Sequence, residues 1–247
     1  MADSLQDERI QYDAALKALL DNLGGEIGSG TITDPTRMGA INYIKAKLDE
    51  LVPEGEGITF NLSTDPNISD PLNLLISAHL DEGVKDVCLS APLSVLFPTA
   101  LAGEGVHTGD AKTGYIILPG SFLRLSSVRM EDWERDGTLT TPETALGKRQ
   151  GNRWLMGGPS KPVAVLDWKS IDSVMKRVIK YYSVDDSHAI DKLFYIPEQT
   201  AEAFLIVNPN LMDALAWMVA GKIMQITGMK EEAKMAQERV AQAYLNL

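Results

Sequence analysis

The sequence contains a single cysteine, Cys88, among 247 residues. One cysteine cannot close a disulfide within the chain, and no Cys-x-x-Cys pair or Cys/His cluster is present to predict a zinc site. This usage is typical of a reducing compartment, so we expect a protein made in the cytoplasm. Cys88 falls on the apolar face of a predicted helix, which favours a buried structural thiol over a reactive nucleophile.

Long apolar runs are also missing. The most apolar stretch, Leu211–Ile226, is interrupted by Asp213 and Lys222 and falls short of the roughly 20 residues needed to cross a bilayer. The N-terminal sequence MADSLQDERI is acidic and lacks the basic start and apolar run of a secretory signal. We therefore expect neither a membrane span nor export.

Basic residues are scarce relative to acidic ones. The chain has 23 Lys and Arg against 34 Asp and Glu, a formal net charge of -11. Nucleic-acid binding depends mainly on Lys and Arg side chains that neutralise phosphates, so this balance argues against a protein that binds phosphates over its whole surface. The 45% hydrophobic and 23% charged residues are typical of a globular chain of one large or two small domains.

Both ends of the chain predict helices, because apolar residues recur there at spacings of three and four. Three Asp-Pro or Asn-Pro pairs, at Asp34, Asp70 and Asn208, are expected to start helices with an acceptor at the N-cap and a proline at the first helical position. Pro92 is expected to end one helix, and Gly228 to separate the last two. The predicted helical faces are Tyr12, Leu16, Leu19 and Leu23; Met38, Ile41, Ile44, Leu48 and Leu51; Leu72, Leu75, His79, Val84, Val87, Cys88 and Ala91; Leu211, Leu215, Met218, Val219, Ile223 and Ile226; and Met229, Ala233, Ala236, Val240, Ala243 and Leu247.

The middle of the chain predicts strands, because the period shortens toward two and β-branched and aromatic residues become common. The pair Pro119-Gly120 is a turn signal and predicts a hairpin or a sharp bend. The polar stretch 136–161 is expected to be a long loop, and loops of that length usually contact something. The expected strands are Tyr115–Leu118, Phe122–Met130, Pro162–Trp168, Ser173–Tyr182 and Lys192–Ile196.

These patterns together predict an α+β protein with a helical core and a β-rich insertion. We expect a helical segment over residues 1–104, the β-rich insertion over 105–206, and a C-terminal helical hairpin over 207–247 that completes the helical core.

No motif in the chain requires catalysis. The cluster His79-Leu80-Asp81-Glu82 has the residue types of a metal site, but neighbours one and two apart on a helix point in different directions. His107 and His188 each stand alone in predicted loops, and neither a phosphate-binding glycine loop nor a Gly-x-Ser-x-Gly elbow occurs. We therefore expect no catalytic residue, no cofactor and no metal.

The charge distribution is more informative than any motif. Between residues 121 and 182 lie eleven of the 23 basic residues but only seven of the 34 acidic ones. One interpretation is that this basic middle meets an acidic face of another copy or of a different protein, because complementary potentials fix register and speed association. Ordinary variation of a solvated surface is equally compatible with the counts. The candidate interface residues are Arg149, Arg153, Trp154, Lys161, Lys176 and Arg177.

Three segments resemble a known family: ILPGSFLRLSSVRMEDWER, the stretch GNRWLMGGPSKPVAVL, and the tail from NPNLMDALAWMVAGKIM to QERVAQAYLNL. They are similar to the head-to-tail connector, or adaptor ring, proteins of tailed bacteriophages, most closely those of short-tailed crAss-like phages. The matching elements would be a β turn and strand at Leu118-Pro119 with Phe122 and Leu123, a second strand at Pro162–Leu166, and a hairpin at Met212–Tyr244 as ring scaffold. The first 70 residues have no counterpart in this comparison.

The resemblance implies a virion structural protein without catalytic activity, made in the host bacterial cytoplasm and located at the head–tail junction. Its partners would be the portal protein, copies of itself in a twelvefold ring, the next tail component, and passing DNA that is not bound sequence-specifically. Two alternatives stay open. One is a small metal-dependent hydrolase that uses His79, Asp81 and His107. The other is a nucleic-acid-binding module that uses the basic residues of the candidate interface.

Overall fold

The computed structural model describes residues 35–51, 71–101, 106–110, 112–152, 154–182, 184 and 188–247. The α+β prediction is confirmed. The chain divides into two compact units: a helical unit of residues 1–96 and 199–247, and a β unit of residues 97–198. The β unit therefore begins and ends earlier than the expected insertion, 105–206. The reason is local, because Thr99 and Ala100 already pair with a strand of this unit, and Thr200 caps a helix that starts at Ala201.

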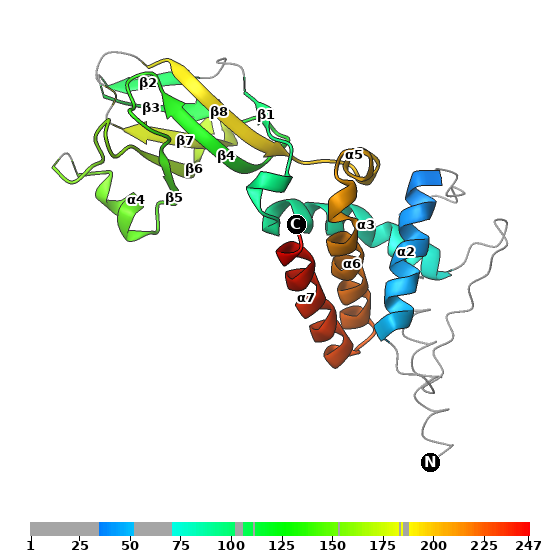
Figure 1. Ribbon diagram of the computed structural model, residues 1–247. Coiled ribbons are helices and arrows are strands. Elements are labelled where there is room, and N and C mark those ends of the chain that lie inside the picture. Colours follow the sequence, from blue (N-terminus) through cyan, green and yellow to red (C-terminus); the bar gives the residue numbers. More distant parts are fainter. Residues whose placement is uncertain are drawn as a thin grey trace, which may run out of the picture. The chain divides into compact units, whose positions relative to one another are not determined.

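The helical unit is built around one buried helix, α6, which packs against α2, α3 and α7 (Figure 1). The predicted faces of α2, α3, α6 and α7 supply most of its core, as their spacing of three and four requires. The predicted helix over residues 12–23, and the caps Asp34 and Asp70, lie outside the described residues. The elements are α2 (Pro35–Leu51), α3 (Pro71–Ser90), η1 (Leu93–Val95), α5 (Ala201–Val207), η2 (Pro209–Leu211), α6 (Met212–Ile226) and α7 (Lys230–Leu245).

Two glycines explain how these helices fit together. Gly83 lies inside α3, and a Cβ atom there would stand 2.5 Å from Cγ2 of Val219, so glycine permits the close approach of α3 to α6. Gly228 has φ +86 and ends α6. Its N–H donates to Gln225 O at 3.2 Å while Met229 N–H donates to Met224 O at 2.8 Å, the two bonds of a Schellman motif. The predicted α6–α7 hairpin is confirmed.

The helix start predicted at Asn208-Pro209 is confirmed in position, since Asn208 is the N-cap residue and Pro209 the first residue of the short helix η2. The expected side-chain cap is wrong, because the Asn208 side chain makes no capping hydrogen bond. Instead the backbone N–H of Asn208 donates to Phe204 O at 3.0 Å and ends α5. The expected β-rich insertion reaches residue 206, but Thr200 Oγ1 accepts a hydrogen bond from Ala203 N–H and starts α5 at Ala201.

The β unit consists of two sheets that share one core. A three-stranded sheet has the order β1-β8-β4, and a five-stranded sheet has the order β2-β3-β7-β6-β5, in which only β5 and β6 are parallel. Core residues come from both sheets, among them Ile116 and Ile179 from one and Val128 and Leu193 from the other. The elements are β1 (Thr99–Ala100), β2 (Val106–Asp110), β3 (Thr113–Ile117), β4 (Phe122–Met130), β5 (Thr138–Thr140), α4 (Ala145–Arg149), β6 (Val163–Ile171), β7 (Val174–Tyr182) and β8 (Ile190–Pro197).

Two expectations for the β unit are settled by this topology. The Pro119-Gly120 pair makes a sharp bend and not a hairpin, because β3 and β4 belong to different sheets. Phe122 N–H donates to Pro119 O at 3.0 Å across that bend. The polar stretch 136–161 is not a structureless loop, since it contains β5 and α4, and Thr144 Oγ1 caps α4 by accepting from Gly147 N–H at 2.9 Å.

Within the described residues, no single helix has the length and apolarity of a membrane span; α5 and Pro209–Ile226 reach that threshold only as a pair bent by 107°.

Candidate interaction surface

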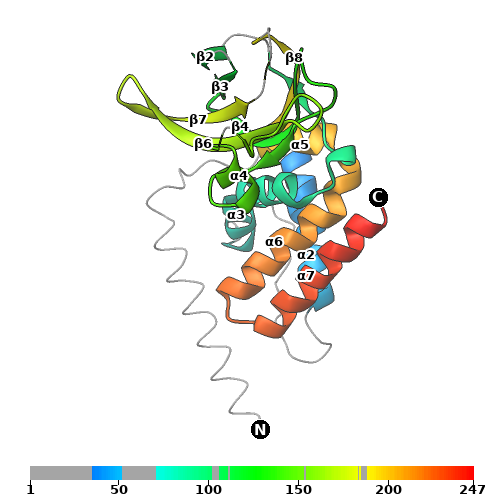
Figure 2. The ribbon, with the colours of Figure 1, turned by 90° about the vertical axis from the view of Figure 1, so that its left-hand side faces the viewer.

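The long hairpin of β6 and β7 extends beyond the other strands of the β unit (Figure 2). We call its outer part, residues 168–177, the arm. Asp172 and Ser173 form its tip, with positive φ values of 52 and 64. A two-residue hairpin turn needs such φ values when its twist matches that of the two strands. The cross-strand pairs Trp168–Arg177, Lys169–Lys176, Ser170–Met175 and Ile171–Val174 follow in register.

One face of the arm continues the apolar stripe of the core. Ala164 on β6 and Ile179 on β7 point into the core, and with a period of two the same face carries Trp168 and Met175 further out. These two side chains are 57% and 58% exposed. The stripe therefore runs past the region that the second sheet covers, and we call Trp168 and Met175 the open stripe.

Arg177 holds the indole of Trp168 in place. Its Cζ lies 5.6 Å from the centre of the Trp168 ring and 5.3 Å from that of Phe122, so the guanidinium stacks with both rings. A side chain ordered in this way loses little conformational entropy when a partner covers it. The open stripe is thus prepared for a contact.

The opposite face of the arm carries lysines. Lys169 and Lys176 stand directly across from each other, next to the apolar pair Ile171 and Val174. Nearer the core, Lys180 donates to Asp167 Oδ2 at 2.5 Å, and this hydrogen bond lowers the pKa of the Asp167 carboxyl.

The candidate interface residues fall into two groups. Lys176 and Arg177 lie on the arm, one on each face. The exposed residues Arg149, at the end of α4, and Lys161 lie in the polar stretch, as does Trp154, which is 89% exposed; Arg153 lies outside the described residues. No hydrogen bond or ion pair between described residues joins the two groups.

Sequence reasoning missed the most telling residues of this surface, Trp168 and Met175. The signal was present, because apolar residues keep alternating toward the tip of the predicted hairpin.

The two units differ in charge. The β unit has 13 basic and 13 acidic residues, and the helical unit has 10 basic and 21 acidic residues. The whole net charge of -11 therefore belongs to the helical unit.

The candidate metal ligands do not converge. His79 Nδ1 pairs with Glu82 Oε2 at 3.4 Å, while Asp81 Oδ1 accepts from the backbone N–H of Ala201 at 2.9 Å. His107 lies on β2 of the other unit, stacked on Tyr115. Among the described residues no group of three or more His, Cys, Asp or Glu side chains could hold a metal ion. Cys88 is buried, which raises the pKa of its thiol to about 11.

Asp81 has an evident structural function. Besides capping α5 at Ala201, its Oδ2 lies 3.5 Å from Nη2 of Arg37, so it links α3 with α2 and α5. We expect D81A to lower the free energy of unfolding by about 1–2 kcal/mol, because a helix N–H loses its acceptor. Urea unfolding measures this, with E238A as a control of equal charge on an exposed stretch of α7. Equal stability of the two variants would contradict the capping function. Destabilisation of the wild-type chain by a chelator would also contradict this structural function, because it would indicate a bound metal ion.

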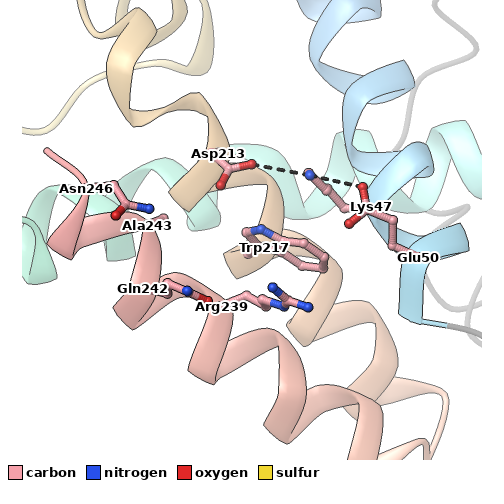
Figure 3. Close-up of a pocket in the computed structure, with 8 residues that line it drawn as sticks. All are labelled: Lys47, Glu50, Asp213, Trp217, Arg239, Gln242, Ala243 and Asn246. Atoms are coloured by element: carbon pink, nitrogen blue, oxygen red, sulfur yellow. Dashed lines mark hydrogen bonds and ion pairs between the residues drawn. The ribbon is translucent and has the colours of Figure 1, made fainter.

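A pocket of about 230 Å³ lies between α2, α6 and α7 (Figure 3). The indole of Trp217 stands between two cations, with Lys47 Nζ 4.8 Å and Arg239 Cζ 5.9 Å from its centre. Lys47 also binds Glu50 at 3.0 Å and Asp213 at 3.5 Å. Two cations and two carboxylates line the pocket, so it has no excess charge to attract a charged ligand. The contacts join the three helices.

No protein-family model matches the chain, and a comparison with curated protein sequences found no match.

Proposed function

We propose that this protein is a virion structural subunit: a ring-forming head-to-tail adaptor that docks on the portal of a tailed phage, extends the DNA channel and links it to the tail. The observation that carries the proposal is the open stripe on the arm, an ordered apolar surface that its own unit leaves uncovered. Exposed apolar surface of this kind marks a site of contact.

The segments of the resemblance support the same function. LPGSFLRL spans the bend between the two sheets and the start of β4, the second segment leads into β6, and the tail forms the α6–α7 hairpin. Each is therefore part of the scaffold of one unit.

The charge separation suits a ring. A closed ring requires a head-to-tail interface, which joins two different faces of the subunit. A near-neutral β unit with a basic arm and an acidic helical unit are different faces of this kind. The acidic unit also suits a channel through which DNA passes without being held, because like charges repel.

Electron microscopy of the protein mixed with the portal protein of the same phage tests the proposal. We expect rings of about twelve copies stacked on the portal, as the resemblance implies, and no turnover of substrate. The protein alone is the control, because subunits of this kind are often monomeric until the portal assembles them. A monodisperse monomer that stays monomeric in the presence of the portal would refute the adaptor function.

A further inference from the structure

The lysine face of the arm, Lys169 and Lys176 with Ile171 and Val174, carries an unbalanced charge. Like charges directly opposite each other on two strands are unfavourable. Neither lysine forms an ion pair with a described residue; Lys169 Nζ lies 4.4 Å from the centre of the Tyr115 ring. An anion placed between the two amines would remove the repulsion.

The same face also carries apolar side chains that a partner could cover. Val174 is 56% exposed at the end of β7, and Ile171 lies opposite it. A free inorganic anion would leave this pair uncovered. The matching occupant is a peptide segment that carries both carboxylates and apolar side chains.

A protein segment fits better than a nucleic acid. Binding of single strands relies on aromatic rings that are free to stack on bases. The Tyr115 ring is already in contact with the His107 ring, whose centroid lies 4.9 Å away, and with Lys169. Tyr115 lies on β3, and its two partners come from strands on opposite sides of β3, His107 from β2 and Lys169 from β6. The Tyr115 ring is therefore not free to stack on a base.

The chain itself contains a segment of the required chemistry. Residues 1–34, which lie outside the described residues, have seven acidic and two basic residues. Within them Tyr12, Leu16, Leu19 and Leu23 recur at the spacing of an apolar helical face. Residues 52–70 have four acidic residues and no basic ones, but no such apolar repeat.

We propose that the acidic segment 1–34 of one copy docks on the lysine face of the arm of a neighbouring copy. This goes beyond the adaptor function and does not depend on it, since an N-terminal segment can dock on the arm whether or not rings form.

Carbodiimide coupling of the purified full-length chain tests the proposal, because it joins an amine to a carboxylate in direct contact. Mass spectrometry is expected to find Lys176 or Lys169 joined to an acidic residue of segment 1–34. The pair Lys180–Asp167 is the internal control, since its two groups touch in the same hairpin. The proposal is overturned if the control link forms while the two arm lysines join no carboxylate of residues 1–34, or join only residues 52–70.

Charge reversal separates docking from a structural effect. K176Q removes one amine and the repulsion with Lys169, so it should not lower the melting temperature, yet it should reduce the link from Lys169 to segment 1–34 by roughly threefold to tenfold. D13K/D21K should reduce it similarly, and combining D13K/D21K with K169E/K176E should restore segment 1–34 to the arm, detected by coupling in the reverse sense. A K176Q chain that keeps the full yield of the Lys169 link would contradict the proposal. In a mixture of isotopically labelled and unlabelled chains the link should join two different copies, and links confined to single copies would overturn the proposal.

Discussion

The double variant W168S/M175S is expected to lose ring assembly on the portal while its fold is kept. The two side chains are more than half exposed, so the unfolding free energy should fall by no more than about 1 kcal/mol, mainly through loss of the Arg177 stacking contact. Large apolar side chains at the centre of an interface contribute about 2 kcal/mol or more each, which is about thirtyfold in affinity. The loss recurs at every contact of a ring, so assembly should stop.

Electron microscopy and sedimentation of portal mixtures measure this effect, and urea unfolding measures the stability. The control is L245S, which removes another exposed apolar side chain from the end of α7, where no stripe leads into a core. Wild-type rings formed by W168S/M175S would show that the open stripe is not an assembly contact. Loss of rings in L245S but not in W168S/M175S would indicate that the assembly contact lies on the helical unit.

The helical core could be predicted from the sequence because its signals are local. Apolar residues three and four apart define the buried faces of α2 and α6, and Gly228 supplies the left-handed residue that ends α6. Asn208 shows where a local signal fails. The residue types at 208 and 209 fit a helix start, yet the side chain is buried next to η2 and makes no cap.

In the β unit the sequence predicts strands β3, β4, β6, β7 and β8 but misses β1, β2 and β5. Alternation gives the two faces of β3, β4 and β6 but not their partners, which depend on residues distant in the sequence. The Pro119-Gly120 signal is therefore compatible with both a hairpin and a sharp bend. The parallel pairing of β5 with β6 has no local signal at all.

The candidate surface was predicted through charge and not through shape. The excess of basic residues between 121 and 182 led to Lys176 and Arg177, which do lie on the arm. It could not distinguish the two faces of the hairpin, because that requires knowing where the second sheet stops covering the first. Trp168 and Met175 become informative only once their exposure is known.

Gly114 is a position whose importance no sequence pattern indicates, and G114A is expected to destabilise the β unit strongly. A Cβ atom there would lie 2.1 Å from Tyr181 Oη and 2.6 Å from the backbone oxygen of His107. Tyr181 is fully buried, and its hydroxyl is hydrogen-bonded to His188 Nδ1 at 2.8 Å, so the ring has no free direction in which to move. We expect a loss of about 3 kcal/mol or more in the free energy of unfolding, the upper range for overpacking.

The sign of the change in the free energy of unfolding distinguishes a steric clash at Gly114 from an effect on the entropy of the unfolded chain. Replacing glycine by alanine without a clash stabilises a protein by about 0.4–1 kcal/mol, because the unfolded chain loses freedom. G120A is the matched control, since nothing lies within 4 Å of its added Cβ atom, and it should stabilise the protein by about 0.4–1 kcal/mol. Urea unfolding of both variants measures the difference.

A double-mutant cycle with Y181F identifies the colliding atom. Y181F alone should cost about 1 kcal/mol through the lost hydrogen bond to His188. Because it also removes the oxygen that the new Cβ meets, G114A/Y181F should be more stable than the sum of the single changes by about 1 kcal/mol or more. Burial raises the pKa of Tyr181 to about 12, so the hydroxyl is protonated at neutral pH, where the cycle is measured. Strict additivity would place the cost of G114A at atoms that Y181F keeps, the Tyr181 ring carbon Cζ or the His107 backbone oxygen at 2.6 Å, and not at the tyrosine hydroxyl.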